Sequence, residues 1–145
     1  MKITVCTIVG IIGTGIAGAF GGWNSAITTL LIFMAIDYIS GLVVAGIFKK
    51  STKTESGALN SNIGWKGLAK KGMTLLYVLM AARIDLIFGS TYIRNAVIIA
   101  FITNELISIT ENAGLMGIHI PPVIVSAIDV LQKRSNKKVE DKEEK

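Results

Sequence analysis

The sequence is poor in the residues from which disulfides, metal sites and catalytic centres are built. It contains one cysteine, Cys6, and one histidine, His119. A single cysteine excludes an intramolecular disulfide, and a single histidine without companion ligands argues against a metal site. No nucleophile, ligand set or phosphate-binding loop accompanies the acidic residues. We therefore expect no enzyme activity, no metal and no cofactor.

Charged residues are also scarce. Only 17% of the 145 residues are charged and 51% are hydrophobic, with a mean hydropathy of +0.58, whereas soluble domains are about a quarter charged. No charged residue occurs from Ile3 to Ile36. This composition predicts an all-α integral membrane protein with a single membrane domain over residues 1–132. The net charge of +5 comes without the aromatic–basic interleaving of nucleic-acid-binding proteins, so we expect no nucleic-acid partner.

Apolar segments and the breaks between them predict the elements. Gly21–Ser25 and Gly89–Thr91 are turn signals that separate neighbouring segments. A short amphipathic stretch after Pro121 predicts a helix on the membrane surface. We expect four transmembrane helices, this surface helix and a charged, disordered tail, at about residues 3–20, 26–48, 73–88, 92–111, 121–133 and 133–145.

Lysine placement predicts the orientation. The lysine-rich linker 49–71 and the C-terminus should both face the cytoplasm of a bacterial cell, because positive charge flanking spans stays inside. Two spans before the linker place the N-terminus inside as well. If the first segment is a cleaved signal peptide, or lies on the membrane surface, three spans remain and the N-terminus is outside.

A polar arc lies within the last predicted span. Wound as a helix, Ala96–Asn112 places five polar side chains on an arc of about 120°. Acidic groups at membrane depth are rare and are functional by default. The candidates for a polar pore face or helix contact in this arc are Asn104, Glu105, Ser108, Glu111 and Asn112.

Two more aspartates lie in predicted spans. Asp37 is at the midpoint of the second, where a carboxylate costs about 3 kcal/mol, so its face should meet protein or water. A hydrogen-bonded structural role is as well supported as a functional one. Asp85 shares a side with two alanines and is an interior-contact candidate, whereas Arg83 can extend to the membrane interface.

Small residues recur at helical spacing in the first two spans. Such stripes let helix backbones approach closely in lipid. We expect a self-association stripe whose partner is either another span of the chain or a neighbouring copy, formed by Gly10, Thr14, Gly18, Gly22, Gly41 and Ala45.

The order of these motifs resembles a known family. Its most specific block is Asn104-Glu105-Leu106-x-Ser108-Ile109-x-Glu111-Asn112. Weaker positions are Asp37-x-x-x-Gly41, Leu59-Asn60-Ser61, Gly67-Leu68-x-Lys70-Lys71, Asp85, Arg94 and Gly117-x-x-x-Pro121. From about Ile27 to Leu131 the sequence is similar to the phage lysis and toxin-secretion holin family, which includes the holin of clostridial toxin loci.

The resemblance implies a non-enzymatic pore former of the bacterial cytoplasmic membrane. Holins oligomerise into lesions through which an endolysin, or in some loci a large toxin, crosses the membrane. The expected partners are membrane lipids, further copies of the chain and an antiholin, with endolysin or toxin as cargo. A small ion or metabolite transporter, a channel subunit and a holin antagonist of the same fold remain alternatives.

Overall fold

The computed structural model describes the backbone of residues 2–143 and the side chains of residues 4–134. Over that part of the chain all regular secondary structure is helical, which confirms the all-α prediction. The elements in chain order are α1 (Lys2–Ala19), α2 (Ser25–Val43), the π-helical turn η1 (Val44–Phe48), α3 (Ser61–Phe88), α4 (Tyr92–Leu115) and α5 (Pro122–Glu143).

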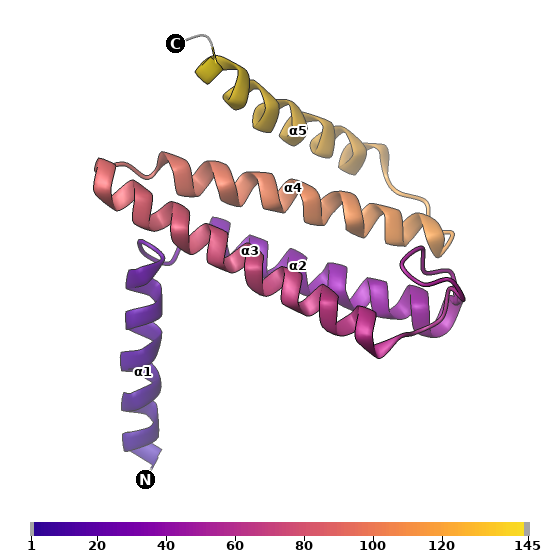
Figure 1. Ribbon diagram of the computed structural model, residues 1–145, viewed down its shortest axis with the longest axis horizontal. Coiled ribbons are helices and arrows are strands. Elements are labelled where there is room, and N and C mark those ends of the chain that lie inside the picture. Colours follow the sequence, from indigo (N-terminus) through magenta and orange to yellow (C-terminus); the bar gives the residue numbers. More distant parts are fainter. Residues whose placement is uncertain (1, 144–145) are drawn as a thin grey trace.

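Three helices form the body of the molecule. α2, α3 and α4 lie side by side, with α3 antiparallel to α2 and α4, whereas α1 projects crosswise from one end of this bundle (Figure 1). α5 starts at the opposite end, turns back along α4 and diverges from it (Figure 1). The end from which α1 projects also carries the α3–α4 turn, and the other end carries the loop between η1 and α3.

Local signals explain where these helices begin and end. The side chain of Asn24 accepts a hydrogen bond from the amide of Ile27 and caps α2, and Asn60 caps α3 through the amide of Asn62. Gly89 ends α3 in the left-handed conformation, with φ of 64°, which glycine adopts without steric cost. The π-helical turn at the end of α2 is a form often found at functional sites.

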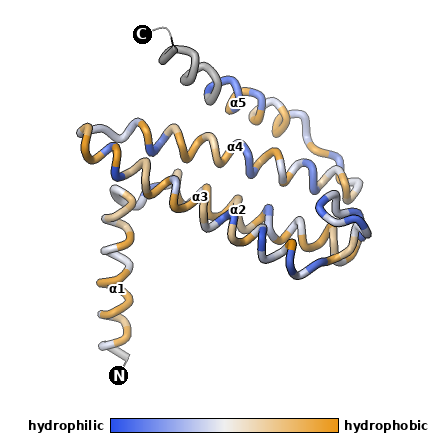
Figure 2. The backbone as a smooth tube through the Cα atoms, viewed as in Figure 1, coloured by the Kyte–Doolittle hydropathy of each residue, from blue (hydrophilic) through white to orange (hydrophobic). Residues whose placement is uncertain are grey.

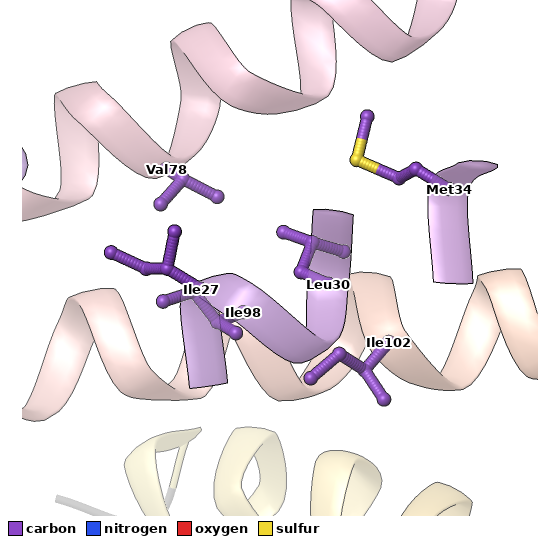
Figure 3. Close-up of a cluster of buried hydrophobic side chains, with 6 residues drawn as sticks. All are labelled: Ile27, Leu30, Met34, Val78, Ile98 and Ile102. Atoms are coloured by element: carbon purple, nitrogen blue, oxygen red, sulfur yellow. The ribbon is translucent and has the colours of Figure 1, made fainter. Parts of the chain in front are cut away.

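An apolar cluster fills one half of the bundle. It joins α2, α3 and α4 through Ile27, Leu30, Met34, Val78, Ile98 and Ile102 (Figure 3). On α2 these positions recur every three or four residues, so they share the face that turns toward the other two helices. The same face continues into Asp37 and Gly41, where the interior becomes polar.

Within the described residues two helices, not four, are long and apolar enough to cross a membrane: α2 with η1, Ser25–Phe48, and α4, Tyr92–Leu115. The apolar helix Thr4–Ala19 is shorter and reaches about 24 Å at 1.5 Å per residue. α3 is longer but less apolar, because it carries lysines in its first half and Arg83 and Asp85 near its end. Hydrophilic residues gather at the end of the bundle where α2 leads into α3 (Figure 2).

Two predicted boundaries differ from the structure. The lysine-rich segment 49–71 is not a linker throughout, because α3 begins at Ser61 and takes its second half. α5 continues past residue 133 to Glu143, so most of the tail expected to be disordered is helical. Residues 144 and 145, the end of that tail, lie outside the described residues.

Candidate functional site

One cation bridges two carboxylates in the middle of the bundle. The Nζ atom of Lys71 on α3 lies 2.8 Å from Oδ2 of Asp37 on α2 and 2.5 Å from Oε2 of Glu105 on α4. Their side chains are only 13%, 10% and 12% exposed, respectively. Each of the three bundle helices thus contributes one charged group, and the three are named the Lys71 cluster.

Asn112 extends this cluster toward the end of α4. Its amide nitrogen donates to the side chain of Asp37 at 3.2 Å and to the hydroxyl of Ser40 at 2.9 Å. Asn112 also packs over Gly41, where an added Cβ would lie 3.8 Å from that nitrogen. The contacts of Asp37 therefore join α2 to both other helices.

A cavity of about 260 Å³ adjoins the Lys71 cluster and extends to the loop that joins η1 to α3. Helix faces rich in small and polar residues line it, among them Tyr38 on α2 and Gly64 and Gly67 on α3. Its outer wall includes loop residues 51–54, with Lys53, and Lys70. The bundle thus has an apolar cluster toward α1 and, toward the loop, a cavity lined by both charged and apolar residues.

A second polar cluster joins three helices at the α1 end. The carboxylate of Asp85 accepts hydrogen bonds from the hydroxyl of Ser90 and from the amides of Ile93 and Arg94. It therefore caps the start of α4 from the end of α3. The Nη1 atom of Arg94 donates to the carbonyls of residues 20–22, at 2.7, 2.7 and 3.2 Å. This satisfies carbonyls at the end of α1 and ties α1 to the bundle.

The predicted polar arc of α4 divides between two environments. Glu105, Ser108 and Asn112 point into the bundle and line the cavity. Asn104 also lines the cavity but is exposed, and Glu111 is exposed and does not line it. The structure therefore brings three of the five together with Asp37, while Asp85 lies in the separate cluster around Arg94.

The residues of the predicted self-association stripe lie in different surroundings. Gly41 and Ala45 pack within the bundle, with Ala45 only 7% exposed. Gly22 lies beyond the end of α1, with φ of 93°. Gly10 and Gly18 have open space where a Cβ would lie, and the hydroxyl of Thr14 bonds back to the carbonyl of Gly10. Only the α1 part of the stripe faces outward.

Sequence reasoning missed the two cations that organise these clusters. Lys71 was assigned to the cytoplasmic linker, although it directly precedes an apolar segment and lies 34 positions from both Asp37 and Glu105. This equal spacing is the signal that could have identified Lys71. Because α3 runs antiparallel to α2 and α4, residues at equal separations on the three helices can meet at the same level of the bundle. Arg94 follows the α3–α4 turn and was noted only as part of the family pattern.

The arrangement holds helices together rather than performing chemistry. No group of three metal-ligating residues occurs in the described part of the chain. The lysine is occupied by two carboxylates. The carboxylate of Asp85, which accepts from the hydroxyl of Ser90, also accepts from two backbone amides and so serves as the cap of α4.

Similar proteins are found in bacteria and in a bacteriophage. An uncharacterized protein of Clostridium perfringens is 34% identical over 92% of this chain and 96% of its own length. An uncharacterized protein of Listeria innocua is 39% identical over 94% of this chain and 91% of its own. A probable holin of Bacillus phage phi105 is 32% identical over 77% of both chains. No solved structure matches the chain significantly.

The family model that matches is described as the bacteriophage holin family, and its match covers residues 14–133. This range includes the Lys71 cluster, the Arg94 cluster and all of the bundle. The resemblance drawn from the sequence motifs is thereby confirmed. The chain belongs to the bacteriophage holin family, whose members are not enzymes.

Proposed function

We propose that this chain is a holin that oligomerises in the bacterial cytoplasmic membrane and forms lesions that release an endolysin, or a large toxin, for host lysis or secretion. Family membership supports the class of function. The single structural observation that carries the proposal is the Lys71 cluster, because it pairs membrane-embedded charges inside one chain.

The proposed orientation has three crossings. α2, α3 and α4 cross the membrane, with the lysine-rich loop and the start of α5 in the cytoplasm. α3 is included because its charges are accommodated: Lys71 is paired, Asp85 caps α4, and Arg83 is exposed near the helix end and can reach the interface. α1 then lies on the outer side of the membrane. This is the three-span alternative from the sequence analysis, in which the N-terminus is outside.

The paired charges favour a closed monomer that can later open. Lipid is as apolar as the side chains that pack in it, so apolar contacts give little driving force between membrane helices, and polar contacts matter more. While Lys71 binds Asp37 and Glu105, its ammonium offsets one of the two carboxylate charges and donates a hydrogen bond to each carboxylate. In an oligomer around an aqueous lesion, water can hydrate the same groups. The polar face is thus hidden in the closed chain and available to line the lesion.

Glu105→Leu tests this proposal. The closed bundle keeps the neutral pair of Lys71 and Asp37, whereas the lesion lining loses a carboxylate and gains an apolar side chain. We expect membrane insertion to persist and lysis to be delayed or abolished in bacteria that co-express a cytoplasmic endolysin. Glu55→Leu, in the exposed loop, is the matched control and should lyse on time. Unchanged lysis timing in Glu105→Leu would refute the role assigned to the cluster.

The same assay separates the alternative functions. A small-solute transporter would change ion or metabolite flux without releasing endolysin. A holin antagonist would oligomerise without lysing and would delay a lytic partner. Abrupt permeability to a protein of endolysin size, on expression of this chain with endolysin alone, is the outcome expected of a holin.

A further inference from the structure

The cavity beside the Lys71 cluster contains charges that the closed bundle does not use. Among the described residues, salt bridges are formed only by Lys71 with its two carboxylates. Lys53 and Lys70 also line the cavity, and neither is in a salt bridge. Both carboxylates in the cavity wall bind Lys71. With three lysines against two carboxylates, the lining has a net positive charge, which favours an anionic ligand.

The position of these two lysines indicates which anion can reach them. α3 enters the membrane from the cytoplasmic side in the proposed orientation, and side chains on a helix lean toward its N-terminus. Lys70 therefore points toward the loop, where Lys53 lies in the outer wall of the cavity. The cavity opening then lies at the cytoplasmic boundary of the membrane, the level of phospholipid headgroups. Basic pockets between membrane helices on this side commonly bind anionic headgroups.

Size and surroundings agree with a headgroup. A volume of about 260 Å³ is below the roughly 300–1,000 Å³ of pockets that enclose a drug-sized molecule, so acyl chains would remain outside in the membrane. Neutral donors line the wall, including Tyr38, Ser51 and Asn104. Trp65 on the neighbouring surface of α3 is 72% exposed, and tryptophan is enriched at membrane interfaces.

We propose that this cavity binds the headgroup phosphate of an anionic phospholipid of the cytoplasmic leaflet, through Lys53 and Lys70. The inference rests on the proposed membrane orientation and deepens the proposed function, since it names a lipid partner for the closed bundle. A lipid seated between α2, α3 and α4 bridges the loop to the helices and stabilises the closed form. Opening of the bundle must then release it.

Lipid retention by the purified full chain tests the proposal. The protein is reconstituted in bilayers of equimolar phosphatidylglycerol and phosphatidylcholine, extracted into detergent, and analysed for bound lipid by native mass spectrometry. We expect the wild type to retain phosphatidylglycerol in preference to phosphatidylcholine. Lys53→Gln with Lys70→Gln should retain about tenfold less, at the scale of surface lysine–lipid attraction.

A control pair removes the same net charge elsewhere. Lys50 and Lys66 are exposed, as Lys53 and Lys70 are, but do not line the cavity. Lys50→Gln with Lys66→Gln should therefore keep the retained lipid. Equal loss in both pairs would show only diffuse attraction and would overturn the proposal, as would a wild type that retains no phosphatidylglycerol.

Two further arms separate the ligand source and the mode of binding. Inorganic phosphate at millimolar concentration should not displace the lipid; displacement would assign the site to a free phosphate instead. Gly67→Leu fills the cavity without changing charge and should also abolish retention, and retention by this variant would place the lipid elsewhere. All arms measure bound lipid rather than lysis, so they remain decisive if the chain forms no lesion.

Discussion

At the scale of single residues, Lys71 has the largest effect expected of any side chain in the bundle. Its ammonium lies between carboxylates from two other helices, and all three groups are nearly inaccessible to solvent. Such a cluster gives little net stability over an apolar one, but removal of the lysine leaves two carboxylates without a cation, and breaking a buried ion pair in this way costs about 3–5 kcal/mol. Whether a substitution stabilises or destabilises the closed bundle therefore depends on which charge it removes.

Lys71→Met should open the closed form early. It leaves Asp37 and Glu105 facing one another without a cation, so the closed bundle loses stability relative to a hydrated, open arrangement. We expect earlier lysis than the wild type in timed expression with an endolysin, at equal amounts of membrane-inserted protein. Lys66→Met, on the exposed surface of the same helix, should not change the timing.

A second substitution tests whether the two carboxylates cause that effect. Glu105→Gln added to Lys71→Met removes one of the opposed charges, and the double variant should recover much of the delay before lysis. Residues in direct contact typically couple by about 0.5–3 kcal/mol. Additive timing in the double variant would contradict direct coupling between Lys71 and Glu105.

At the scale of helices, the sequence predicted the elements bounded by strong local signals. Asn24 places the start of α2 at Ser25, and the Gly89 turn places the start of α4 at Tyr92. The start of α3 was missed because glycines and lysines from Gly64 to Lys71 have the composition of a loop. That segment is helical because Tyr38 packs on its glycines and two carboxylates receive Lys71, and both partners lie on other helices.

The candidate site was predicted in part for the same reason. The arc on α4 could be derived from helical periodicity within one segment, and it contains Glu105, Ser108 and Asn112. Periodicity cannot tell which of two neighbouring acidic residues meets a cation on another helix, so Glu111 was grouped with Glu105. The family motif includes Lys71 and Arg94, but it does not indicate which residues they contact.

The orientation of α1 leads to a prediction about the N-terminus. Arg94 ties the end of α1 to the α3–α4 turn, and α1 projects crosswise from the bundle (Figure 1). With three crossings, the N-terminus lies outside. An N-terminal epitope tag should therefore be cleaved by protease added to intact spheroplasts, whereas a C-terminal tag should be cleaved only after lysis. If both tags are protected from the protease, both termini are cytoplasmic, and the arrangement with four crossings would be correct instead.

At the scale of the whole molecule, the bundle has two unlike halves along its length. The cavity beside the Lys71 cluster occupies the loop end, and the apolar cluster occupies the end near α1. Leu30 and Ile98, at the centre of that cluster, are both 0% exposed. A path through a single chain is therefore blocked by packed side chains. The proposed lesion, which has to pass a protein, would therefore form between chains and be lined by polar faces that a single closed chain keeps inside.

Leu30→Ser distinguishes a path within one chain from a lesion between chains. The substitution removes packing at a fully buried position and adds a hydroxyl, which favours entry of water into the space left; large-to-small core changes typically cost about 2–5 kcal/mol. We expect leakage of protons and small ions from vesicles that contain the variant, while protein-sized cargo is retained until oligomers form. Ile32→Ser, at a position on the same helix that is 51% exposed, should leave vesicles as tight as the wild type does. If Leu30→Ser instead releases small ions and protein-sized cargo together and at once, the apolar cluster would be part of the lesion wall, and the separation between the two halves of the bundle would be wrong.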